Sequence, residues 1–173
     1  MKQKEMVQWL RPEPGALEPG PSIKVVKVRP GTPVVGFFLS DYVHCVVTHW
    51  INGRTKPCIG AGNHCEGCKI GLDKRPKGYI AVACDFSGTV KLLEITEKAF
   101  DSNLRLSSVQ GLRGLYFTAR RKGETNNSEL IIEINDAKKP AQQLPDDIDV
   151  QEVLCRIWFG KEKNRGQKGM DNV

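Results

Sequence analysis

The chain has 173 residues, 39% of them hydrophobic, with a formal net charge of +6 at pH 7 and a sequence pI of about 9.0. This composition excludes a disordered chain, and the positive charge favours a polyanionic partner. The first residues are charged with no apolar run behind them, and no stretch of about 18 apolar residues occurs, so we expect neither a signal peptide nor contact with a membrane. We therefore expect a cytoplasmic protein with reduced thiols.

The N-terminal half predicts an arm followed by strands. Residues 1–21 are rich in proline and glycine beside mixed charge, which predicts a flexible arm. Alternating valines over 22–28 predict a first strand that stops at Pro30-Gly31. The long passage over 34–50, rich in β-branched and aromatic residues, predicts one bent strand or two.

The C-terminal half predicts two strand pairs and two helices. Apolar runs over 78–84 and 89–95 flank a short loop with glycine at its end, which predicts an antiparallel hairpin. Thr96 is a candidate cap for a short helix over 96–101, and strands are expected over 115–120 and 129–134. Residues 137–160 are expected to form a linker and then a helix that begins with the capping box Asp149 to Glu152, and residues 161–173 a basic flexible tail. The helix carries an apolar stripe that we expect to face the core: Val150, Val153, Leu154, Ile157 and Trp158.

This order of elements predicts a mainly β fold. Five or six short strands, with one brief helix before the last pair, favour a small OB-type β-barrel over residues 22–136. A zinc loop over 49–77 is inserted between neighbouring strands, and a C-terminal helix follows the barrel. The sequence alone leaves other small barrels open.

Cysteine and histidine spacing within the loop predicts a structural Zn²⁺ site. Cys65 and Cys68 are separated by two residues that include a glycine, and this tight turn can direct two thiolates at one ion. Cys58 lies seven residues upstream. The fourth ligand is His49 or His64, and we favour His49 because adjacent residues such as His64 and Cys65 tend to point apart. The remaining cysteines, Cys45, Cys84 and Cys155, have apolar neighbours and are expected in the core.

The candidate catalytic motifs are weak. His64-Cys65-Glu66 superficially matches the His-x-Glu of zinc deaminases, but their two-cysteine element lies well downstream, and here it overlaps the motif. Four protein ligands would also fill the positions around zinc, whereas a catalytic zinc keeps one position open. A phosphate-binding loop of the Gly-x4-Gly-Lys-Ser/Thr type is absent from the sequence. We therefore expect no enzymatic activity, with a zinc-dependent hydrolase or nuclease as the least favoured alternative.

Aromatic and basic residues near the loop favour binding to single-stranded nucleic acid. Such proteins combine a cationic groove for phosphates with aromatic faces on which bases stack. The partner is expected to be single-stranded DNA, with RNA as an open alternative. Another open function is a protein-interaction adaptor in a larger nucleoprotein complex, with protein partners of its own. The candidate nucleic-acid-binding residues are Trp50, Arg54, Lys56, Lys74, Arg75, Lys77, Tyr79, Arg120 and Arg121.

The ligand order His49, Cys58, Cys65, Cys68 resembles that of the zinc-containing single-stranded DNA-binding (helix-destabilising) proteins of tailed phages. The resemblance covers about Val43 to Tyr79 and ends in the same Cys-x2-Cys pair. It implies an OB-type core with a zinc subdomain, and a role in DNA replication, recombination or repair with little sequence specificity. Two features depart from that family: the first two ligand spacings are shorter here, and the C-terminal end is basic where the phage proteins are acidic.

Overall fold

The computed structural model describes residues 7–10, 12, 22–60, 62, 64–84, 88–101 and 111–160. Strands dominate these residues, so the expectation of a mainly β fold is confirmed. In chain order the elements are β1 (Val7–Trp9), β2 (Val25–Lys27), β3 (Val34–Phe38), β4 (Val43–Ile51), β5 (Arg54–Pro57), α1 (Glu66–Lys69), β6 (Arg75–Cys84), β7 (Val90–Thr96), α2 (Glu97–Ala99), β8 (Tyr116–Arg121), β9 (Leu130–Asn135) and α3 (Val150–Phe159).

Strand β6 organises the sheet because it is long enough to pair with two strands along one edge. Its first half runs antiparallel to β4, with Thr48 opposite Arg75, and its second half runs antiparallel to β3, with Gly36 opposite Cys84. The apolar passage over 34–50 is therefore two strands that follow each other along one edge of β6. The other edge of β6 pairs with β7 along most of its length.

The remaining strands extend this arrangement into one mixed sheet. Strand β3 pairs with β8, which forms a hairpin with β9. Strand β2 runs parallel to β7, and β1 runs parallel to β4. The sheet is not closed: among the described residues β9 pairs only with β8, and the second edge of β7 is taken by β2.

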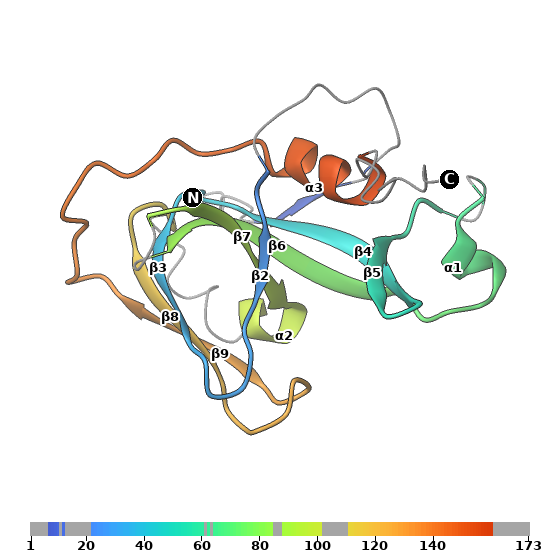
Figure 1. Ribbon diagram of the computed structural model, residues 1–173, viewed down its shortest axis with the longest axis horizontal. Coiled ribbons are helices and arrows are strands. Elements are labelled where there is room, and N and C mark those ends of the chain that lie inside the picture. The colour runs from blue at the N-terminus through green and yellow to red at the C-terminus, as the bar shows by residue number, and fades with distance from the viewer. Residues whose placement is uncertain are drawn as a thin grey trace, which may run out of the picture.

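Two apolar cores lie on opposite faces of the sheet, because side chains alternate along each strand. One core contains Phe38, Ile80, Leu93 and Phe117 together with Ala99 of α2. The other lies between the sheet and α3 and contains Leu39, Tyr79, Leu92 and Leu154. Figure 1 shows α2 and α3 on opposite sides of the sheet. The expected core cysteines Cys45, Cys84 and Cys155 are all buried.

Helix α3 begins and packs largely as its sequence predicts. The Asp149 carboxylate accepts a hydrogen bond from the Glu152 amide at 2.9 Å, which caps the helix N-terminus. Val150, Val153 and Leu154 are buried, as expected for the apolar stripe, whereas Ile157 is 42% exposed. The Trp158 ring makes an edge contact with Tyr79, with centroids 5.8 Å apart. Helix α3 therefore covers the face of the sheet that contains Tyr79.

A partly buried histidine near the start of α3 makes stability depend on pH. Among the described residues, the buried Nδ1 of His44 has no hydrogen-bond partner. Burial lowers the His44 pKa from its ordinary value of 6.5, and the nearby carboxylates Asp147 and Asp149 oppose that effect only in part. The folded state thus favours neutral His44, and its contribution to stability is present above about pH 6.5 and lost as pH falls through the lowered pKa.

We therefore expect the free energy of unfolding to fall less steeply between pH 7 and pH 5 in His44→Gln than in the unchanged protein. Glutamine is polar but cannot acquire this charge. Denaturant titrations at several pH values measure the two slopes. Equal slopes would show that His44 does not contribute to the pH dependence.

Two parts of the expected organisation need correction. Val7–Trp9, within the expected arm 1–21, forms β1, because it can add to the open edge of β4. The expected zinc loop over 49–77 contains β5 and the start of β6. The short helix α2 is confirmed in place, with the Ala99 amide donating to the Thr96 hydroxyl at 3.2 Å. The tail over 161–173 and most of the arm lie outside the described residues.

No helix in the described part of the chain combines the length and the apolar character needed to cross a membrane.

Candidate metal centre

Four side chains converge at the end of the β4–β5 hairpin. The ligand atoms of His49, Cys58, Cys65 and Cys68 all lie within 4.8 Å of one another. The Cys68 Sγ is 3.5 Å from the Cys58 Sγ and 3.5 Å from the His49 Nε2. Ligands of a tetrahedral zinc ion are about 3.5–3.8 Å apart, given Zn–S bonds of about 2.3 Å and Zn–N bonds of about 2.0 Å. These four residues therefore fit around one metal ion.

Each ligand has its position fixed by backbone structure. His49 lies on β4, and Cys58 follows β5, where its amide donates to the Val47 carbonyl at 2.8 Å. Cys65 caps α1 and Cys68 lies within it, so a single helical turn directs both thiols toward the hairpin. The Lys69 amide donates to the Cys65 carbonyl at 3.0 Å, which holds that turn closed. The site thus joins the β4–β5 hairpin to α1, which are separate segments of the sequence.

The structure brings His49, and not His64, to the cysteines. His49 is 1% exposed, and its Nδ1 lies 3.1 Å from the Asp73 carbonyl oxygen. Because a carbonyl only accepts, Nδ1 carries the proton and donates it, which leaves the Nε2 lone pair directed at the thiols. His64 is exposed and lies outside the cluster. The preference for His49 therefore agrees with the observed geometry.

Hydrogen bonds among the thiols distribute negative charge unevenly. Burial alone would raise the pKa of Cys65, but hydrogen bonds from the Cys68 and Ile59 amides and from the other two thiols lower it to about 6. The hydrogen bond to Cys58, with burial and the Cys65 thiolate, raises the pKa of Cys68 to about 11. Three neighbouring thiolates repel one another. A bound cation would remove that repulsion, which is how metal binding releases protons from such a site.

A glycine allows α1 to approach the histidine ring. A Cβ atom on Gly67 would lie 2.3 Å from the His49 Cγ, a distance that forces the helix or the ring to move. We expect Gly67→Ala to displace His49, lower the affinity for metal and destabilise the fold by about 1–3 kcal/mol. Chelator competition and thermal unfolding measure both effects.

Gly62→Ala is the matched control, because a Cβ atom there meets nothing within 4 Å. Its metal affinity should equal that of the unchanged protein. Equal behaviour of the two variants would contradict the close packing of α1 against the ring.

The hairpin turn explains why β5 follows β4 so closely. Asn52 and Gly53 both have positive φ, at 50° and 75°. This is the geometry of a two-residue type I′ turn, for which Asn-Gly is the preferred sequence. The Asn-Gly pair was the signal that could have predicted β5, which we had expected to be part of an irregular loop.

Trp50 lies on the opposite face of the hairpin from the metal ligands. His49 and Trp50 are neighbours on β4, so their side chains point to opposite sides. His49 is 1% exposed and Trp50 is 54% exposed. The Lys27 Nζ lies 5.7 Å from the centroid of the Trp50 ring, within reach of a cation–π contact. The hairpin therefore presents an aromatic face to solvent with the metal ligands behind it.

Tyr79 cannot offer its ring to a base in this structure. Its side chain is 1% exposed, and its hydroxyl donates to the Glu94 carboxylate at 3.3 Å. Burial and the Glu94 charge raise its pKa above the ordinary value. The expectation that Tyr79 binds nucleic acid is corrected: it packs beneath α3 because its position on β6 falls on the covered face.

Most of the expected phosphate-binding cations have partners within the protein. Lys56 pairs with Glu66 at 3.0 Å, Lys77 with Glu94 at 3.2 Å and Arg120 with Glu133 at 2.9 Å. Arg75 lies at 4.0 Å from the Asp73 carboxylate. The Arg121 guanidinium donates to the Val28 and Ser128 carbonyls.

The expected cations also do not form one surface. Arg54 and Lys74 are exposed near the metal ligands, whereas Arg120 and Arg121 lie on β8. Figure 1 shows the β8–β9 hairpin at a distance from the β4–β5 hairpin and α1. The structure thus brings together the metal ligands but not the nine expected nucleic-acid-binding residues.

Comparison of the chain with protein-family models, with curated proteins and with solved structures gives no match.

Proposed function

We propose that this protein binds single-stranded DNA with little sequence preference, and that a structural Zn²⁺ stabilises the hairpin that makes the contact. The observation that carries the proposal is Trp50, a large aromatic ring that is 54% exposed beside a lysine. Base stacking on such a ring contributes about 1–3 kcal/mol per base. A role in DNA replication, recombination or repair would follow.

Zinc is the metal that the donor set favours. Three thiolates and one imidazole in a compact cluster form a Cys₃His site, and structural zinc sites of this class are closed and tetrahedral. The four protein ligands fill all positions, and this arrangement supports a stabilising role and no enzymatic activity. A reducing cytoplasm would keep the cysteine ligands as thiols.

The order of elements supports an OB-type barrel as the scaffold. Strands β3 and β4 together, then β6 and β7, precede the short helix α2, and the β8–β9 hairpin follows it. The pairing of β8 with β3 brings this hairpin back to the first strand, as in a five-stranded Greek-key barrel that remains partly open. Strand β5 and helix α1 then lie between the first two barrel strands, where OB-type proteins carry a ligand-binding loop.

A binding titration tests the proposal. Fluorescence anisotropy with labelled single-stranded DNA, duplex DNA and RNA of equal length should show the tightest binding to single-stranded DNA. Because phosphate contacts release counterions, the logarithm of the affinity should fall with the logarithm of salt concentration, by about 0.7 for each phosphate neutralised. Binding to none of the three at low salt would refute the proposed function. Tighter binding to RNA than to single-stranded DNA would identify RNA as the natural partner.

A further inference from the structure

A cationic hollow lies along the edge of the sheet formed by β2 and β7. It has a volume of about 380 Å³, and every charged residue that lines it is basic. The half-buried Val25 and Val26 also line it. The basic residues around it are Lys24, Lys27, Arg29 and Lys91.

Two of these lysines are held next to each other by strand pairing. Val25 is opposite Leu92 in the parallel β2–β7 pair, and the Leu92 amide donates to the Lys24 carbonyl at 3.0 Å. Lys24 is therefore the cross-strand neighbour of Lys91. Like charges in this position destabilise a sheet. Among the described residues, no carboxylate forms an ion pair with Lys24, Arg29 or Lys91, so their charge is not neutralised within this part of the protein.

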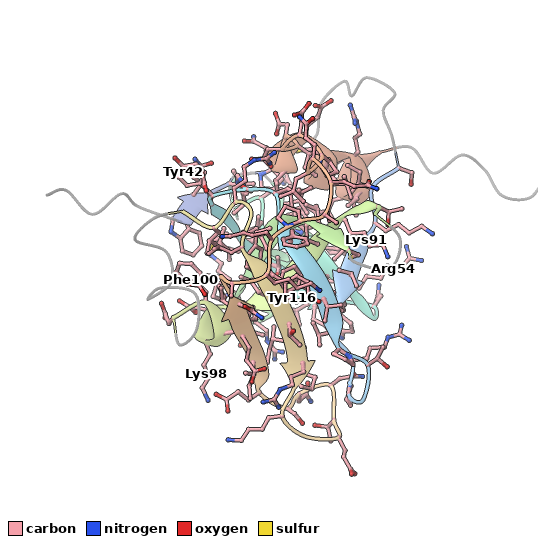
Figure 2. The ribbon with its side chains drawn as sticks, turned by 90° about the vertical axis from the view of Figure 1, so that its left-hand side faces the viewer. Tyr42, Arg54, Lys91, Lys98, Phe100 and Tyr116 are labelled. Atoms are coloured by element: carbon pink, nitrogen blue, oxygen red, sulfur yellow. The ribbon has the colours of Figure 1, made fainter. Side chains whose placement is uncertain are left out.

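One residue, Lys27, links the hollow to the exposed tryptophan. Lys27 lines the hollow, and its Nζ also lies 5.7 Å from the Trp50 ring centroid. The same Nζ is 3.7 Å from the Glu94 carboxylate, which fixes Lys27 between the two features. In the view of Figure 2, Lys91 of β7 and Arg54 of the β4–β5 hairpin both lie toward the same edge of the molecule. Lys27 therefore brings positive charge from the rim of the hollow to the exposed ring.

Two other cationic regions of the described structure contain ion pairs. A second hollow, of about 330 Å³, contains Lys77, Lys98 and Arg121, but it also contains Glu129, which pairs with Lys98 at 3.3 Å. Near the metal ligands, Lys56 pairs with Glu66. An anion approaching these regions would have to displace a carboxylate. An anion approaching Lys24, Arg29 and Lys91 would instead relieve repulsion.

We propose that Lys24, Arg29 and Lys91 bind the backbone phosphates of the single strand whose base stacks on Trp50. This inference rests on the proposed function and assigns its phosphate contacts to β2 and β7, away from the cations of the metal loop. The polynucleotide would extend from the β4–β5 hairpin to the edge of the sheet at β2. Lys27 would lie between the stacked base and the bound phosphates.

The test compares two triple variants that each remove three positive charges. The first is Lys24→Gln with Arg29→Gln and Lys91→Gln, and the control is Lys56→Gln with Lys74→Gln and Arg75→Gln. Affinity for labelled single-stranded DNA is measured across a series of salt concentrations. Three lost phosphate contacts should reduce the salt slope of the first variant by about 2, and the control slope should change by less than half of that.

The outcomes separate this inference from the proposed function. An unchanged slope in the β2–β7 variant, or an equal or larger change in the control, would overturn the assignment while single-stranded DNA binding itself stands. Unchanged protein that fails to bind single-stranded DNA would overturn the proposed function and this inference together. Because Lys24 and Lys91 repel each other, the first variant should unfold at a temperature no lower than that of the unchanged protein, so a loss of affinity would not result from misfolding.

Discussion

Removing the metal should unfold the β4–β5 hairpin and α1 while the central sheet keeps most of its structure. Two of the four metal ligands belong to the single turn of α1 and its N-cap, and α1 has only four residues, too short to persist alone. Structural zinc contributes about 10–16 kcal/mol of folding free energy in zinc-finger peptides. Packing within the hairpin and α1 cannot compensate for a loss of that size. Hydrogen exchange after chelation measures this directly.

Specific amides report on each part of the protein. The Cys58 amide donates to the Val47 carbonyl and the Leu72 amide to the Gly67 carbonyl, so both should lose protection when the metal leaves. The Leu39 amide, which donates to the Ala81 carbonyl in the central sheet, should stay protected. Loss of protection at all three would mean that the metal holds the whole fold. Full protection at all three would mean that the metal is dispensable.

Cys68→Ser should reproduce the effect of chelation, because the Cys68 Sγ is close to both Cys58 and His49. Elemental analysis of the purified variant should find less than one bound metal ion per chain. Cys155→Ala is the matched control: this cysteine is equally small and is buried in α3, outside the cluster. The control should keep its metal.

Replacing Trp50 with alanine should weaken binding to single-stranded DNA by about fivefold to 150-fold, equivalent to about 1–3 kcal/mol for one stacked base. The fold should be little affected, because the ring is 54% exposed and therefore buries little apolar surface. Anisotropy titrations at constant salt measure the affinity, and thermal unfolding checks the fold.

Trp9→Ala separates stacking from a general loss of aromatic surface. Trp9 is 60% exposed, but it lies on β1, on the opposite side of β4 from β6. Its removal should leave the affinity unchanged. An equal loss in both variants, or no loss in Trp50→Ala, would remove Trp50 from the binding surface.

The sequence predicted local structure well where one strong pattern decided it. The Thr96 and Asp149 caps and the buried stripe of α3 each follow from residues close together in the chain. The metal cluster was also predictable, because thiol and imidazole side chains in a glycine-rich segment have few other uses. Strand β5 was missed because Lys56 and Arg54 do not alternate with apolar residues, although Asn52-Gly53 signalled the turn.

The candidate binding surface could not be predicted because it depends on pairing between distant strands. Lys24 and Lys91 become neighbours only through the parallel register of β2 and β7. Tyr79 looked available beside basic residues, but α3 comes from about 70 residues further along the chain and covers it. Likewise, the cations near the metal ligands looked free until the fold placed carboxylates such as Glu94 beside them.

The β4–β5 hairpin carries the metal ligands on one face and Trp50 on the other. Binding of the metal and binding of the polynucleotide would therefore be thermodynamically coupled without direct contact between the two ligands. An ordered hairpin holds Trp50 in one orientation. The metal-bound protein would therefore lose less conformational freedom on binding single-stranded DNA than the metal-free protein. Linkage then works in both directions: the bound strand would slow escape of the ion by the same free energy that the ion adds to the affinity. Metal supply would in this way set how much of the protein is ready to bind.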